Sequence, residues 1–361
     1  LFTLDIPSYL PVVQYADKRE LREKIWRGFS SRAWDDDFDN SNIILKIVKL
    51  RHDRAQLLGY QTHADFILER RMAETRNNVE EFLIKLSDAY KKAALHDLQA
   101  MKTLASEIDG LNDFKPWDVA YYAEKLKEKS FSFSSEDVRP YFQLENVLKG
   151  AFEHFSKLFR LRFEENPDYP VWHQDVKCYD VYEMGSKRFI GTLYSDFHPR
   201  KGKKSGAWKF GLRSQGLFKG KVERPVVGIV CNFTKPTKDT PSLLTHDEVT
   251  TLFHEMGHAI HGLLSDVTYP SLAGTSVKWD FVELPSQVQE NWCYEKVTLD
   301  LFAHHYKTGE PMPQELVDKL YEARNFMVGW AGLRQINFAT LDMAWHTINP
   351  DEITDVPSFE D

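Results

Sequence analysis

Two histidines and a glutamate, His254, Glu255 and His258, have the spacing of a metal site on a helix. Residues four apart lie on one face of a helix, so both imidazoles can bind the same ion. Imidazole and carboxylate ligands suit Zn²⁺, and a catalytic zinc site keeps one position for water. Bound zinc lowers the pKa of that water to about 7, and Glu255 as general base then delivers hydroxide to a polarised carbonyl. These residues therefore predict amide hydrolysis.

The site needs a third ligand from elsewhere in the chain. A histidine ten residues after His254 would indicate the metzincin pattern, but that position is Leu264, and His261 replaces the glycine of that pattern. As a fourth ligand His261 would remove the water position, so an outer or packing role is expected. The third ligand should be a carboxylate, and the downstream candidates are Asp266, Asp280, Glu283, Glu290 and Glu295.

Residues 279–292 predict a second helix, with Pro285 tolerated in its first turn. Glu283, Gln287 and Glu290 would share one face of that helix, at four- and seven-residue spacing. One carboxylate can bind the metal while the other two side chains hold the second nitrogens of the histidines. Spacing alone does not separate Glu283 from Glu290 as the ligand.

The elements that position these residues follow from local patterns. Thr245 and Glu248 fit a capping box, which predicts that the histidine helix starts there. Residues 1–165 have helical periodicity, for example from Val79 to Ala94, and helical periodicity returns from about 241 to 347. Between them, short β-branched or aromatic runs at 171–172, 178–182, 189–194 and 226–233 predict a small sheet. The fold class expected is mainly α, with a small β-sheet element around residues 170–235.

A cluster of five basic residues lies among these strand-like runs, and either binds an anionic group, such as the terminal carboxylate of a peptide, or forms a solvated hairpin loop. The cluster comprises Arg200, Lys201, Lys203, Lys204 and Lys209.

Composition narrows the class of protein. The 361 residues are 42% hydrophobic and 28% charged, as in ordinary globular proteins. The net charge of -8 argues against a nucleic-acid partner. The longest apolar runs, such as 226–233, are too short to span a membrane. Three unpaired-looking cysteines favour a reducing compartment. A cytoplasmic protein is expected, with the periplasm as the alternative.

Several segments together resemble the thimet-oligopeptidase family of zinc metallopeptidases, and within it most closely the peptidyl-dipeptidase (dipeptidyl carboxypeptidase) branch. The segments are LFHEMGH at 252–258, DFVELPSQ at 280–287, ENW at 290–292, PWD at 116–118, YAE at 122–124, PYFQLE at 140–145, VCN at 230–232 and LDMAWH at 341–346.

The resemblance implies Glu283 as the third ligand of one Zn²⁺ per chain and Glu255 as the catalytic base. It also implies a helical clamshell: residues 1–165 form its helical part, residues 166–240 a β element lining the cleft, and residues 241–361 the helical zinc-binding part, truncated at the C-terminus. Short, unstructured peptides are the expected substrates. The peptidyl-dipeptidase branch implies release of C-terminal dipeptides, and the oligopeptidase branch implies internal cleavage.

The chain also departs from the family pattern. It stops before a C-terminal segment with a His and a Gly-Tyr-Tyr stretch, which in the family stabilises the developing oxyanion, and a sizeable N-terminal part is also absent. Losing one oxyanion donor costs about a hundred- to a thousand-fold in rate. Impaired turnover and association through uncovered apolar surface are therefore expected. The alternatives to a peptidase are a fragment that binds zinc and peptide without useful activity, and a buried structural helix without metal.

Overall fold

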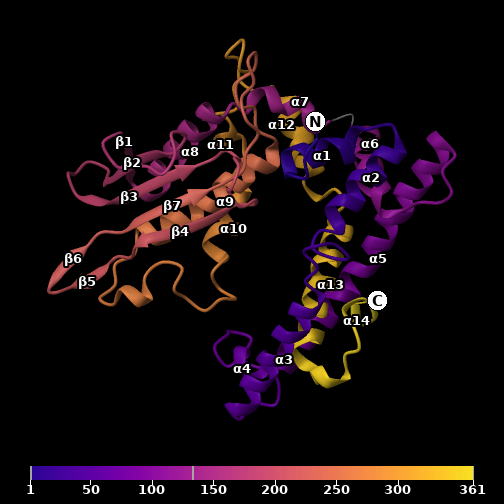
Figure 1. Cartoon of the computed structure of the whole chain (residues 1–361). Helices are drawn as coiled ribbons and strands as arrows, with labels where there is room; N and C mark the ends of the chain where they lie inside the picture. The colour runs from indigo at the N-terminus through magenta and orange to yellow at the C-terminus, as the bar shows by residue number, and fades with distance from the viewer. Residues whose placement is uncertain (1, 132–133, 361) are drawn as a thin grey trace. The chain divides into compact units, whose positions relative to one another are not determined.

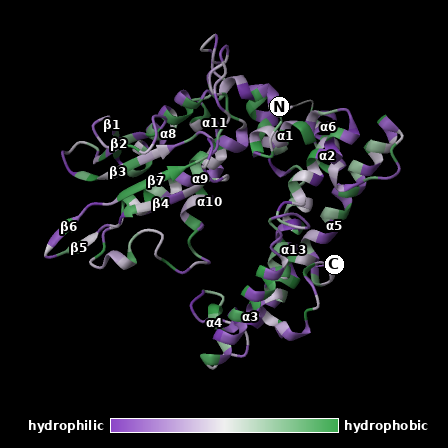
Figure 2. Ribbon diagram, viewed as in Figure 1, coloured by the Kyte–Doolittle hydropathy of each residue, from purple (hydrophilic) through white to green (hydrophobic). Residues whose placement is uncertain are grey.

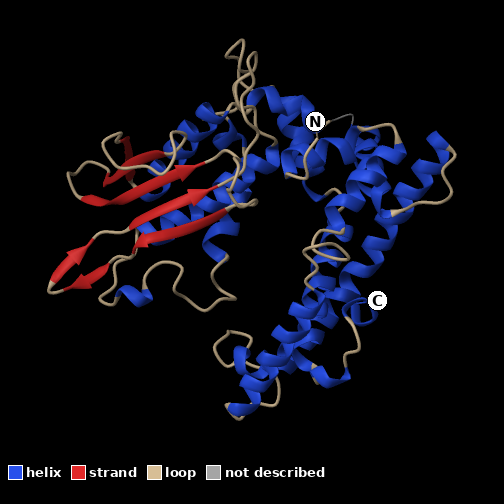
Figure 3. Cartoon of the chain, viewed as in Figure 1, coloured by secondary structure: helices blue, strands red, loops and turns tan. Residues whose placement is uncertain are grey.

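The computed structural model describes residues 2–131 and 134–360. The chain divides into two compact units, unit 1 (Leu1–Ser130 and Asn325–Asp361) and unit 2 (Phe131–Arg324). Among the described residues, unit 1 is built from helices and unit 2 combines helices with a small sheet (Figure 3). The mainly helical class with a small β element is therefore confirmed. The division into residues 1–165, 166–240 and 241–361 that the family resemblance implies stays a prediction.

Unit 1 is built around two long helices, α5 (Arg76–Asp109) and α13 (Val328–Thr347), which pack along each other (Figure 1). Two glycines of α13 allow a close approach. A Cβ at Gly329 would lie 2.6 Å from the backbone of Ala93, and one at Gly332 would lie 2.2 Å from the Tyr90 ring. The other helices of this unit are α1 (Ile6–Tyr15), α2 (Arg19–Ser30), α3 (Ser41–Leu57), α4 (His63–Leu68), α6 (Val119–Phe131) and α14 (Val356–Glu360).

Unit 2 contains a five-stranded sheet in the order β1-β2-β3-β7-β4. The pair β3/β7 is parallel, and the other neighbours are antiparallel. The strands are β1 (Leu161–Glu165), β2 (Lys177–Glu183), β3 (Phe189–Asp196), β4 (Trp208–Arg213) and β7 (Val226–Val230), and a separate hairpin joins β5 (Gly216–Phe218) to β6 (Lys221–Glu223). The helices are α7 (Ser135–Val138), α8 (Leu144–Phe159), α9 (His246–Leu263), α10 (Leu284–Glu290), α11 (Lys296–Leu299) and α12 (Gln314–Glu322).

The predicted sheet is correct in its central strands and wrong at its borders. The runs at 178–182, 189–194 and 226–233 lie in or extend β2, β3 and β7. Residues 171–172 lie outside any strand, and 161–165, predicted as helix, form β1. The reason is Arg160, which ends α8 in the left-handed conformation at φ 53° and turns the next five residues into register with β2.

The core of unit 2 lies between the sheet and α9. Val227 and Ile229 of β7 are buried in the same cluster as Leu252, Met256 and Ala259 of α9. The central strands are accordingly among the most hydrophobic segments in Figure 2. The strand β7 buries four of its five residues, and α9 is buried over most of its length. The two elements therefore hold each other in place. This contact fixes α9 on the sheet. Among the described residues, no helix is long and apolar enough to cross a membrane.

Candidate metal centre

The helix α9 begins with the capping box expected from the sequence. The Thr245 hydroxyl accepts from the Glu248 amide at 3.2 Å, and the Glu248 carboxylate accepts from the Thr245 amide at 2.9 Å. Glu248 also accepts from the Thr234 amide at 2.7 Å, in the loop after β7. The same carboxylate therefore caps α9 and ties its first turn to the sheet.

The next segment approaches α9 closely because residue 257 is a glycine. A Cβ at Gly257 would lie 2.5 Å from the Pro285 carbonyl oxygen and 2.6 Å from the Ser286 Cα. Real Cβ atoms do not come this close to backbone, so a larger residue would push α10 away. The glycine between the two histidines therefore brings the start of α10 to the face of α9 that carries His254 and His258.

The predicted second helix is shorter than expected, which is a correction. Instead of 279–292, α10 spans Leu284–Glu290 and is followed by a 3₁₀ turn at Asn291–Tyr294. Pro285 lies in its first turn, as predicted, and Glu283 is the N-cap residue. Residues 279–283 form turns that lead into the helix. Glu283 therefore lies at the N-terminus of α10 and not on the side of a longer helix.

Three donor groups meet at this point. The Oε2 of Glu283 lies 3.2 Å from Nε2 of His254 and 3.1 Å from Nε2 of His258. One ligand atom from each of these residues lies within 4.8 Å of the others. The two imidazole rings are nearly perpendicular, at 83°, with their centroids 4.9 Å apart. The structure thus brings together the two histidines and the glutamate that the sequence singled out.

The Glu283 carboxylate is held in place by its own helix. The Ser286 hydroxyl donates to Glu283 Oε2 at 2.8 Å and also lies 2.8 Å from the Glu283 carbonyl oxygen. Ser286 is buried, whereas the Glu283 side chain is half exposed. Sequence reasoning missed this serine, although its position three residues after a carboxylate at a helix start is a usable signal.

Glu255 lies beside the three donors and is buried. Its Oε2 has no hydrogen-bond partner among the described residues. Burial, with a smaller contribution from the charge of Glu283, raises the pKa of Glu255 to about 7, although the charge of His254 opposes the shift. A carboxylate with such a pKa gains and loses a proton near neutral pH.

The second nitrogens of the two histidines have different environments. His254 Nδ1 lies 2.7 Å from Glu290 Oε1. Burial favours a lower pKa for His254, but this hydrogen bond and the charges of Glu255, Glu290 and Glu283 together raise it above its ordinary value. His258 Nδ1 is buried and has no partner among the described residues. Burial chiefly lowers the pKa of His258.

Two other residues singled out by the sequence are not in the donor cluster. Gln287 is exposed, and its side chain makes no hydrogen bond to either histidine within the described part of the chain. His261 is partly buried, lies outside the set of converging donors, and leaves its Nδ1 without a partner among the residues described. Their predicted supporting roles stay predictions.

The donor set fits a divalent transition metal. Two imidazoles and one carboxylate are ligands that zinc accepts, and three protein ligands leave a position open. The two Nε2 atoms point at the same carboxylate oxygen, and the outer Glu290 holds one of the rings as metal sites require. Two further side chains contact these donors: Glu290 contacts Nδ1 of His254, and the Ser286 hydroxyl donates to Glu283.

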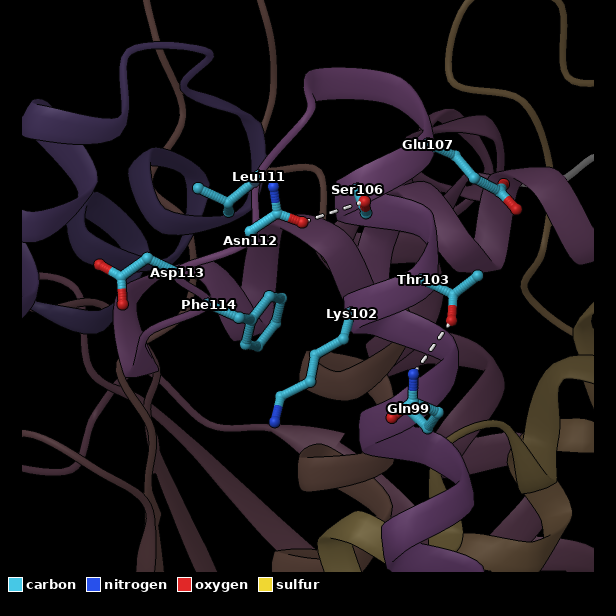
Figure 4. Close-up of a pocket in the computed structure, with 9 residues that line it drawn as sticks. All are labelled: Gln99, Lys102, Thr103, Ser106, Glu107, Leu111, Asn112, Asp113 and Phe114. Carbon is cyan, nitrogen blue, oxygen red and sulfur yellow. Dashed lines mark hydrogen bonds between the residues drawn. The ribbon is translucent and has the colours of Figure 1, made fainter.

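A separate hollow lies in unit 1, between the C-terminal part of α5 and the loop that follows it (Figure 4). It has a volume of about 530 Å³, and Gln99 and Ser106 hydrogen bond to Thr103 and Asn112 at its wall. Its nine lining residues include no histidine or cysteine: Gln99, Lys102, Thr103, Ser106, Glu107, Leu111, Asn112, Asp113 and Phe114.

Comparisons with known proteins show the family of this chain. The family model described as Peptidase family M3 matches residues 12–359. Oligopeptidase A of Escherichia coli is 39% identical over 98% of this chain and 53% of its own length. The organellar oligopeptidase A of Arabidopsis thaliana is 41% identical over 99% of this chain and 46% of its length. Dipeptidyl carboxypeptidase of Escherichia coli is 33% identical over 97% of this chain and 51% of its own length.

The chain spans about half the length of the curated relatives it matches. The family match covers the donor cluster together with nearly all of both units. The protein is a member of peptidase family M3.

Proposed function

We propose that this chain carries the zinc-binding and catalytic part of a metallopeptidase that hydrolyses short peptides. His254, His258 and Glu283 would hold one Zn²⁺ per chain. The observation that supports this most strongly is the convergence of these three side chains within 4.8 Å, with a buried glutamate beside them. When bound, zinc polarises a carbonyl and makes water more acidic.

Glu255 is the proposed general base. Its carboxylate takes a proton from the attacking water and returns that proton to the nitrogen of the departing amine, so that one water is consumed for each peptide bond broken. The raised pKa suits both steps, because a group that titrates near neutral pH accepts and donates a proton with little cost. The burial of Glu255 and the effect of the His254 and Glu283 charges on it support this role.

Glu290 and Ser286 are proposed to position the ligands. Glu290 holds the His254 ring through Nδ1, and Ser286 holds the Glu283 carboxylate. Such supporting contacts fix the orientation of ligands, and their loss typically reduces metal affinity or activity ten- to a hundred-fold.

The proposal is tested with the Glu255→Gln variant. The chain and the variant are loaded with zinc, their metal content is measured, and cleavage of a quenched fluorescent hexapeptide is followed. We expect equal zinc content and a loss of cleavage of at least about a hundred-fold, the scale of general-base catalysis. Zinc content near zero in the parent chain, or undiminished cleavage by the variant, would contradict the proposal. Zinc binding without cleavage by the parent chain would favour the binding-fragment alternative.

Internal cleavage is the second candidate beside dipeptide release. It is favoured by the identity to oligopeptidase A, which at 39% exceeds the 33% to dipeptidyl carboxypeptidase. The products of one hexapeptide with a free C-terminus and one with an amidated C-terminus separate the two. A dipeptide releaser needs the free carboxylate and leaves the amide uncut, whereas an oligopeptidase cuts both.

A further inference from the structure

The structure separates the five basic residues around β4 into different environments. Arg200 and Lys203 both bind the buried Asp196, at 2.7 and 2.8 Å. Lys203 also donates to the Cys231 carbonyl at 2.6 Å. These two cations are therefore occupied within the fold. Lys201 and Lys204 are exposed on the loop before β4.

Lys209 has a different position, on the side of β4 that faces α9. It lies opposite Ile229 in the β4/β7 register, and directly opposed residues of antiparallel strands share a face. Ile229 is buried in the core cluster that contains α9. A Cβ at Gly262 of α9 would lie 3.4 Å from Lys209 Cε and 3.5 Å from Nζ. The glycine therefore leaves room for the lysine side chain between strand and helix.

The ammonium of Lys209 is partly buried and has no acidic partner. Its recorded hydrogen bond goes to the Thr275 hydroxyl at 3.3 Å, and within the described ranges no carboxylate lies within ion-pair distance. Burial lowers the pKa of Lys209. A partly desolvated cation without a counter-ion is unfavourable and is stabilised by an incoming anion.

The ammonium is also close to the histidine–glutamate cluster and to open space. Gly262, beside which the Lys209 ammonium lies, follows His258 by four residues in α9, so the two positions share one face of that helix. On β4, a Cβ at Gly211 would meet only Lys209 Nζ, at 3.8 Å. Because β4 is the outermost strand of the sheet, this space lies at the sheet border.

We propose that Lys209, with the Thr275 hydroxyl beside it, binds a carboxylate of the peptide next to the histidine–glutamate cluster. The carboxylate comes either from an acidic side chain or from a free C-terminus. This inference rests on the proposed function, because it takes a peptide as the ligand. It makes Lys209 a specificity-determining residue, distinct from the proposed metal ligands.

The test is calorimetric titration of peptides into the zinc-loaded chain carrying Glu255→Gln, which prevents cleavage. One set of amidated hexapeptides carries a single Asp scanned through all positions, each beside its Asn counterpart. A second pair is an Asn-only peptide as free acid and as amide. We expect at least one carboxylate peptide to bind about tenfold more tightly than its neutral match, which equals about 1.4 kcal/mol. The set that shows the preference identifies the source of the carboxylate.

The variants separate a local role from net charge. Lys209→Met should abolish the preference without weakening the neutral peptides, Lys209→Arg should retain it, and Thr275→Val should reduce it. Lys201→Met removes the same charge from the exposed loop and should change nothing. Circular dichroism checks that each variant is folded.

Three results would overturn the inference: no preference for any carboxylate peptide, an undiminished preference in Lys209→Met, or no binding of any peptide. Catalysis is measured separately on the parent chain. Cleavage without carboxylate preference would leave the proposed function standing and remove this inference. Preferential binding of a carboxylate peptide without cleavage by the parent chain would support the role of Lys209 and contradict the proposed catalysis.

Discussion

Glu290 contacts the outer nitrogen of His254, and we propose that it orients this ring. The 2.7 Å contact to His254 Nδ1 leaves Nε2 directed at the Glu283 carboxylate. His258 has no such contact among the described residues and is held by burial in α9. The two histidines are therefore fixed by different means, one by a hydrogen bond and one by packing.

Replacing Glu290 with Gln should weaken zinc binding by about ten- to a hundred-fold, because the neutral amide holds and polarises the imidazole less well than a carboxylate. Competition with a coloured chelator measures this. Glu322→Gln is the matched control, because Glu322 is exposed on α12 and lies outside the donor cluster, and the zinc affinity of this variant should equal that of the parent. Unchanged affinity in Glu290→Gln would contradict the assigned role.

The stability of unit 2 should depend on the charge of Asp196. Burial favours a higher pKa for Asp196, but hydrogen bonds from Arg200, Lys203 and Trp172 outweigh it and hold the pKa well below its usual range. A depressed folded-state pKa stabilises the fold above the unfolded value of about 3.9, and this contribution is lost as the pH falls through the folded value.

Asp196→Asn should therefore lower the free energy of unfolding by about 3 kcal/mol at pH 7, because Lys203 stays buried without its counter-charge. The gap between variant and parent should narrow as the pH falls below about 4. Urea unfolding at several pH values measures this difference in unfolding free energy. The control is Asp168→Asn, because Asp168 is exposed. A gap that stays constant down to pH 2 would show that the ion pairs do not stabilise the fold in this way.

At the level of elements, the site depends on how closely α10 meets α9. The helix with the histidines is fixed to the sheet through Val227 and Ile229, and Gly257 lets the Pro285 carbonyl approach. Because Glu283 is the N-cap of α10, any displacement of that helix start moves the carboxylate. The distance between α9 and α10 therefore sets the distance from Glu283 to the two histidines.

Gly257→Ala should separate these elements. We expect a loss of about 1–3 kcal/mol in unfolding free energy from overpacking, together with weaker zinc binding. Gly28→Ala in α2 is the control: there a Cβ would meet only a leucine side chain at 3.8 Å, and alanine is the better helix former. Parent-like zinc affinity in Gly257→Ala would mean that the close approach does not position Glu283.

At the level of the whole molecule, sequence patterns predicted the elements whose position depends on neighbouring residues in the chain. Thr245 and Glu248 gave the start of α9, and the runs of β-branched residues gave β2, β3 and β7. The β4 strand was missed because its Lys209, Gly211 and Arg213 interrupt the apolar pattern, and its register comes from pairing with β7. Glu283 and Glu290 could not be separated by spacing, since their roles depend on where α10 begins and how it meets α9.

Zinc should also stabilise the folded chain, since a metal that binds only the native state adds to its stability. At a hundred times the dissociation constant the gain is about 2.7 kcal/mol. Thermal unfolding with and without a slight excess of zinc should show a higher midpoint with the metal. The His258→Ala variant should show no such rise, and an equal rise in that variant would place the stabilising zinc elsewhere.

Anomalous diffraction at the zinc absorption edge, on crystals of the chain grown with zinc, would locate the metal. We expect one strong peak per chain, about 2.0–2.2 Å from Nε2 of His254, Nε2 of His258 and a carboxylate oxygen of Glu283. A peak bound by other residues, or none between the two imidazoles and Glu283, would contradict it.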